Sequence, residues 1–145
     1  MYIEDIFNNY IFPELKEYVV SKSLYNPKLV KGQPLESKVF PIVPIKLLPI
    51  ENKYSNLSYG EIIISFGLDI NIYAQDNTYN GVKTSKKTIC DEITKLIIEY
   101  FKQYHLSIKV EYDIANIDSN IYRNNIRIMG KVDTKYGENN LVIYP

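Results

Sequence analysis

The pattern that most constrains the fold is an alternation of apolar and other residues that begins at Glu61 and continues to Tyr73. Six apolar residues fall on one face of this segment: Ile62, Ile64, Phe66, Leu68, Ile70 and Ile72. The other face carries Ser65, Gly67, Asp69, Asn71 and Tyr73. Ile63 is the one large apolar exception. A period of two over this length indicates a β-strand with one face on a core and the other against water or a partner.

A second regular segment, from about Thr84 to Tyr104, has helical spacing and follows a turn at Gln75–Gly81. Its apolar residues recur at three- and four-residue steps: Ile89, Ile93, Leu96, Ile97, Tyr100, Phe101 and Tyr104. Thr84 or Ser85 can cap its N-terminus. About twenty helical residues span roughly 30 Å, enough to cross a whole sheet. We therefore predict that this stripe packs on the apolar face of the long strand.

The N-terminal third of the chain is less regular. Apolar residues recur near helical spacing from Tyr2 to Val20, but Pro13 interrupts them. Either one helix kinks at Pro13, or a first helix stops near Ile11 and a second starts with Pro13 in its first turn. The polar, lysine-rich segment Ser21–Ser37 contains two prolines and a glycine, so we predict a loop there.

Three or four further strands complete the predicted sheet. The segment Lys38–Leu48 has the composition of a strand, but Pro41 and Pro44 each remove a hydrogen-bond donor, which favours an edge position or a bulge. The other predicted strands are Ile108–Ile114, Tyr122–Val132 and a short Leu141–Tyr144. We predict one α+β domain over residues 1–145, with a mostly antiparallel sheet of four to five strands, one long helix on one face and an N-terminal helix. The order of elements is α-β-β-α-β-β.

Composition excludes several classes of protein. Seventeen cations balance seventeen acidic residues, so no overall charge attracts nucleic acid or a membrane. A single cysteine cannot form an intramolecular disulfide. The N-terminus lacks the basic start of a signal peptide, and no apolar run reaches the roughly 20 residues that span a bilayer. We expect a protein made in a cytoplasm, without membrane contact.

No catalytic, cofactor or metal site is predicted. The loop before the long helix has Gly81 but not the Gly-Lys-Ser/Thr of a phosphate-binding loop, and its lysines suit a solvated turn better than an anion site. The only histidine, His105, and the only cysteine, Cys90, are predicted to be structural. Asp91 and Glu92 are neighbours on a helix, so their side chains diverge and are predicted to form a solvated surface.

Two arginines on the last long strand are the strongest candidates for an interface. Arg123 and Arg127 alternate away from Ile126 and Ile128, so they are predicted to lie on the face of the sheet that the helix leaves open. Either this face is an ordinary solvated surface, or it contributes a subunit contact, since arginine is enriched at interfaces.

The order of these segments resembles a known family, the tail terminator (tail completion) proteins of long-tailed bacteriophages and phage tail-like particles. The resemblance covers roughly Val39–Val132. It rests on the proline-containing VFPIVPIKLLP strand, the GEIIISFGLDINIYAQD strand, the amphipathic helix and the closing IYRNNIRIMGKVD strand. The Tyr122-Arg123 start of that last strand, after the polar turn Asn116–Asn120, is the most characteristic piece. We therefore include Tyr122 with Arg123 and Arg127 as candidate interface residues.

The resemblance implies a non-enzymatic virion structural protein in the neck end of the tail. Family members form rings, usually homohexamers, on the finished tail tube. They end tube polymerisation and present a surface to the head-side connector. In contractile tails they also meet the sheath, and DNA passes through the ring without sequence readout. The alternatives are another head–tail connector, neck or tube-like subunit of the same particle, and, from a different class, a small α+β enzyme or ligand-binding domain.

Overall fold

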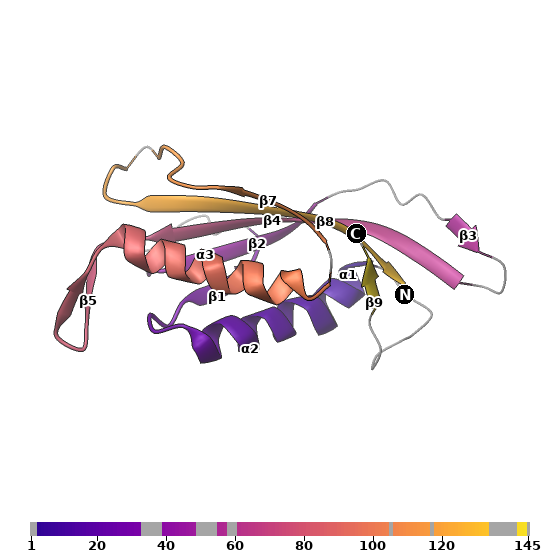
Figure 1. The fold of residues 1–145 in the computed structure, drawn as a ribbon, viewed down its shortest axis with the longest axis horizontal. Coiled ribbons are helices and arrows are strands. Elements are labelled where there is room, and N and C mark those ends of the chain that lie inside the picture. Colours follow the sequence, from indigo (N-terminus) through magenta and orange to yellow (C-terminus); the bar gives the residue numbers. More distant parts are fainter. Residues whose placement is uncertain are drawn as a thin grey trace.

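A computed structural model describes residues 3–32, 39–48, 55–57, 61–104, 106–116, 118–133 and 142–144. Within these ranges a sheet is covered on one face by two helices, and a small hairpin projects at one end (Figure 1). The helical elements are α1 (Ile3–Ile6), the π-helical turn η1 (Phe7–Ile11), α2 (Phe12–Lys22) and α3 (Lys86–Lys102). The strands are β1 (Lys28–Lys31), β2 (Ile42–Leu48), β3 (Ser55–Leu57), β4 (Glu61–Ala74), β5 (Asn77–Tyr79), β6 (Val82–Thr84), β7 (Ser107–Glu111), β8 (Tyr122–Asp133) and β9 (Val142–Tyr144).

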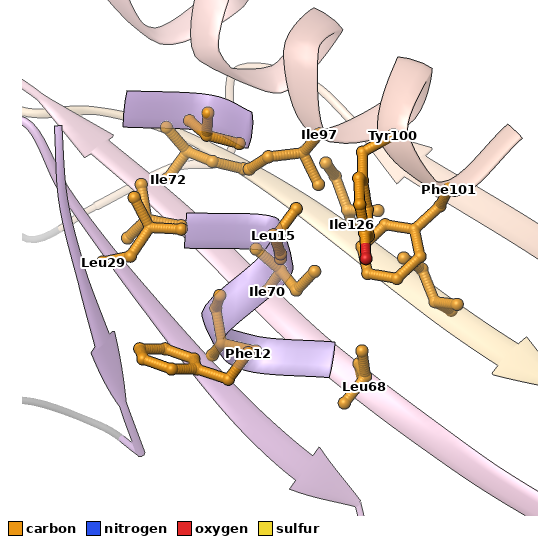
Figure 2. Close-up of a cluster of buried hydrophobic side chains, with 14 of the residues drawn as sticks. Phe12, Leu15, Leu29, Leu68, Ile70, Ile72, Ile97, Tyr100, Phe101 and Ile126 are labelled. Carbon is orange, nitrogen blue, oxygen red and sulfur yellow. The ribbon is translucent and has the colours of Figure 1, made fainter. Parts of the chain in front are cut away.

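The helix α3 packs on the apolar face of β4, as predicted from the two periodicities. Ile89, Ile93, Ile97 and Phe101 are fully buried in the same cluster as Phe66, Leu68, Ile70 and Ile72. Figure 2 shows Ile97, Tyr100 and Phe101 of α3 directed towards this cluster. Leu96 was predicted to be equally buried but is only partly so. Ile62 and Ile64 were also predicted to join this contact, but their side chains lie outside the described residues.

The helix α2 lies beside α3 on the same face of the sheet (Figure 1). Leu15 and Val19 of α2 are fully buried in the shared core. The Tyr100 hydroxyl of α3 donates a hydrogen bond to Glu14 Oε2 of α2 at 3.1 Å. Two helices thus cover this face of the sheet, whereas only one had been predicted to lie on it. No helix among the described residues is both long and apolar enough to cross a membrane.

The N-terminal helical segment does not break at Ile11. Pro13 lies in the first turn of α2, as one of the two alternatives had it, yet Ile11 and Phe12 both keep right-handed helical dihedrals. The turn before them is π-helical, and the Phe12 N–H bonds back to the Phe7 carbonyl. Pro13 has no N–H and cannot donate a hydrogen bond within an α-helix. The wider π-helical turn lies directly before the α2 turn that contains Pro13, and the helical segment continues through the proline.

The fold class is α+β as predicted, but the sheet is mixed. The main strand order is β1-β2-β4-β8-β7, with β3 beside β4 and β9 beside β8. Its β1–β2 pair is parallel, whereas the other described pairs are antiparallel. The strand β1 lies inside the segment that was predicted to be a loop. Its four residues carry too little alternation to be recognised, and its pairing with β2 is a tertiary contact.

The prediction that the proline-containing strand lies at an edge or carries a bulge was wrong. The strand β2 lies between β1 and β4, and its register with β4 is the same on either side of Pro44. The ladder to β4 is interrupted only at Val43 and Pro44, where the proline has no N–H to donate. A central strand therefore tolerates this proline by giving up one short stretch of pairing.

The turn predicted at Gln75–Gly81 is in fact a small hairpin formed by β5 and β6. Asn80 and Gly81 have φ angles of 49° and 79°, the combination that an Asn-Gly type I′ turn requires. The hairpin projects beyond the end of the sheet, next to the start of α3 (Figure 1). The strand β7 is shorter than predicted, since it ends at Glu111 and Asp113 has a φ of 52°.

Candidate functional site

The side chains of β4, β8 and β7 that alternate away from the helices form the open face of the sheet. Register pairs Arg127 with Asp69 on one side and with Lys109 on the other. Four residues earlier on β8, Arg123 pairs with Tyr73. The two arginines therefore share the open face, as the alternation predicted. Their partners could not be predicted, because the register between β4 and β8 depends on the fold.

A polar network connects these strands across the open face. The Asn125 side-chain amide donates to Asp69 Oδ1 at 2.7 Å and to Asn71 Oδ1 at 3.0 Å. Asn71 is only 2% exposed although it faces away from the helices. The Arg127 Nε atom lies 3.6 Å from Asp69 Oδ1. That ion pair is loose and the arginine is largely exposed, so it contributes at most about 1 kcal/mol.

Arg123 is held more firmly than Arg127. Its Nε donates to Asn71 Oδ1 at 3.0 Å, and its guanidinium carbon lies 5.6 Å from the centre of the Tyr73 ring. Among the described residues its terminal nitrogens have no acceptor. A guanidinium fixed at Nε and stacked on a ring is oriented before any partner arrives, and its free N–H groups suit a carboxylate or a phosphate.

These residues surround a hollow of about 320 Å³ on the open face. Its lining consists of Asp69, Lys109, Glu111, Ile114, Arg123, Asn125 and Arg127. Ligand pockets in proteins are mostly apolar with a few polar groups, whereas this lining is mostly charged. The hollow is therefore better suited to polar side chains of a partner than to an apolar small molecule.

The structure does not bring Tyr122 to the open face. Tyr122 lies on the helix-covered side of β8 and is 8% exposed. Burial, together with the nearby Asp91 carboxylate, raises the pKa of its hydroxyl. Of the three candidate interface residues, only the two arginines are placed where a partner can contact them.

Asn124 is a buried polar residue that was not predicted from the sequence to have a role. It is fully buried on the helix-covered face of β8. Its amide nitrogen donates to Asp91 Oδ1 at 3.0 Å and to Thr94 Oγ1 at 2.9 Å, and its oxygen accepts from the Asp113 N–H at 3.0 Å. One asparagine thus ties α3, β8 and the loop after β7 together. The only signal in the sequence was a polar residue at an apolar position of the alternation.

The prediction that Asp91 and Glu92 form a solvated surface was wrong for Glu92 and holds only in part for Asp91, whose side chain is 32% exposed. Asp91 accepts the hydrogen bond from Asn124 and also lies 3.1 Å from the Lys87 ammonium group. Both carboxylate oxygens of Glu92 are buried and have no hydrogen-bond partner among the described residues. Sequence spacing shows that two side chains diverge, but not how far each of them is exposed to water.

The lysine-rich turn before α3 does not offer a vacant anion site at the helix N-terminus. The Ser85 hydroxyl caps the helix by accepting from the Thr88 N–H, and Asp76 Oδ1 accepts from the Lys86 N–H at 2.7 Å. The Lys86 ammonium group in turn donates to the Ser119 carbonyl at 2.7 Å. A carboxylate of the chain itself therefore occupies the position that an anion would take.

Cys90 is fully buried in the first half of α3, and its Sγ lies 3.2 Å from the Ile72 carbonyl oxygen, to which the thiol donates. Burial raises the pKa of this thiol to about 12. Reactive cysteines have lowered pKa values and partial exposure, so Cys90 has the environment of a structural residue. His105 lies outside the described residues. No group of three or more His, Cys, Asp or Glu side chains converges within the part of the chain that the structure describes.

We expect Cys90 to resist alkylation by iodoacetamide at pH 8 in the native protein. The raised pKa keeps the thiol protonated, and only the thiolate reacts. Mass spectrometry would show labelling within minutes in concentrated urea and essentially none without it. Equal labelling rates in both conditions would contradict the burial described above.

Comparison with known proteins adds no family to this description. Neither a scan against protein-family models nor a search of curated proteins found a match to the chain. A function for the chain therefore has to be inferred from its fold, its open face and the order of its elements.

Proposed function

We propose that this chain is a tail terminator: a structural protein, without enzymatic activity, of a long-tailed phage or a related tail-like particle. In this role, copies of the chain form a ring, most often of six in the family it resembles, on the end of the completed tail tube. The ring ends tube polymerisation and offers a surface for the head-side connector. In a contractile particle it also meets the sheath, and DNA passes through its hole.

The observation that carries this proposal is the open face of the sheet. One face of the sheet is covered by α2 and α3, whereas the other carries an ordered network centred on Asn71, Asn125 and Arg123. Side chains that are already hydrogen-bonded to each other lose little further conformational entropy on docking. Such a face supports a permanent protein contact. The order of helices and strands supports the particular family.

Removing the coding sequence from the particle's genome tests the proposal. We expect tails of uncontrolled length, or tails that fail to join heads, because nothing stops the tube at its proper end. Negative-stain electron microscopy would measure the length distribution, and supplying the protein in trans is the control. Normal tails of uniform length joined to heads would refute the assignment. Complete absence of tube would favour a tube-like subunit, and uniform tails without heads a connector.

A further inference from the structure

The open face has a strong charge asymmetry that the overall composition hides. Over the strands whose side chains are described, register places six cations on it: Lys28, Lys46, Lys109, Arg123, Arg127 and Lys131. Among the side chains that the structure describes, two carboxylates share this face, those of Asp69 and Glu111. The described side chains of this face thus carry four more positive than negative charges.

This asymmetry decides which contacts between copies are favourable. Two open faces placed against each other would bring like charges together and repel, so a two-fold dimer through this face is disfavoured. A head-to-tail contact instead joins the positive face of one copy to a negative surface of the next. Contacts of this kind close into a ring when the rotation between copies allows it.

The N-terminal helical segment offers such a negative surface. From Ile3 to Lys22 it has two lysines, Lys16 and Lys22, and four exposed carboxylates: those of Glu4, Asp5, Glu14 and Glu17. The helix α2 lies on the side of the sheet opposite the open face (Figure 1). Beside Glu17 is an apolar hollow of about 430 Å³ on α2. The open face presents a matching apolar side chain, Met129, which is 45% exposed.

We propose that the open sheet face of one copy docks on the N-terminal helical segment of the next copy. Arg123, fixed by Asn71 and Tyr73, takes a carboxylate of that segment. The inference rests on the proposed function, because it assigns the interface of the proposed ring. The exposed Met129 and the two carboxylates on the face favour a protein partner over a phosphate backbone. A protein surface offers apolar and cationic groups beside its carboxylates, whereas a phosphate backbone does not.

Charge reversal on each side of the contact tests the inference. A sheet variant carries Arg123→Glu with Arg127→Glu, and a helix variant carries Asp5→Lys with Glu17→Lys. A control variant, Lys95→Glu, reverses an exposed charge on α3 outside both surfaces. Circular dichroism checks that all variants fold. Light scattering and electron microscopy then measure the concentration at which each protein forms rings.

We expect each reversed variant alone to need at least about a tenfold higher concentration than the wild type, because like charges meet at every contact. An equal mixture of the two variants should form rings again. In an alternating ring every contact is then between opposite charges, either wild-type face on wild-type segment or reversed face on reversed segment. The Lys95→Glu control should assemble normally.

Three results would overturn the inference. The sheet variant could assemble as the wild type does, or the mixture could fail to recover. Alternatively, the wild-type face could bind a fluorescent DNA duplex in a salt-dependent manner that the sheet variant loses, with ring formation unchanged. A ring that forms and controls tail length but ignores these charges would refute only this inference. Normal particles without the protein would refute the proposed function itself.

Discussion

Ile97→Ala is expected to lower the free energy of unfolding by about 2–5 kcal/mol. Ile97 is fully buried where α3 meets the sheet, in one cluster with Leu68, Ile70 and Ile126. Truncation removes apolar contacts on that helix surface and leaves a cavity that neighbours on two elements cannot fill without moving. Urea denaturation followed by circular dichroism measures the change.

The adjacent residue provides a matched control. Leu96→Ala removes a side chain of the same size from the same helix, but Leu96 is only partly buried. We expect the free energy of unfolding to fall less than for Ile97→Ala, because a partly exposed side chain removes less apolar surface from water on folding. Equal losses at the two positions would mean that α3 is rotated relative to the sheet from the orientation described above.

Asn124→Leu is expected to lower the free energy of unfolding by about 1–3 kcal/mol, although it places an apolar residue in an apolar layer. The substitution removes both hydrogen bonds from the amide to α3 and leaves the Asp113 N–H without its acceptor. Thr94 keeps its own bond to the Cys90 carbonyl, so part of the network survives. Thermal and urea denaturation measure the loss.

A second variant separates hydrogen bonding from packing. Asn124→Asp keeps the shape and the acceptor but places a carboxylate next to Asp91, which repels it at neutral pH. We expect this variant to be less stable than Asn124→Leu at pH 7 and to recover part of its stability under acid conditions, where carboxylates are protonated. A fully stable Asn124→Leu protein would show that the network contributes nothing to folding.

The sequence predicts best those helices and strands in which buried residues recur at a regular spacing. The strand β4 and the helix α3 present one apolar face each, and their pattern alone determines which face is covered. Asn124 breaks the same pattern on β8, and its role depends on atoms from α3 and from the loop after β7. No period in the sequence could have predicted those partners.

The errors at β1 and β2 have one cause. The strand β1 is short and polar, so its existence depends on β2 lying beside it. Because β1 pairs with the outer edge of β2, β2 is not an edge strand. Pro44 had favoured an edge position for it. In the same way, alternation predicts that Arg123 and Arg127 share a face. It does not predict Asn71 and Tyr73 as the groups that orient Arg123, since that depends on register between strands distant in the chain.

The position of β4 in the sheet has a consequence for synthesis on the ribosome. One edge of β4 bonds to β2, which precedes it, and the other to β8, which follows only after α3 and β7. A nascent chain that has emerged as far as α3 can cover the apolar face of β4, yet the N–H and C=O groups of its second edge have no partner. Unpaired edges of this kind template aggregation. Until β8 has emerged from the ribosome, nascent chains on one polysome can pair with each other through this edge.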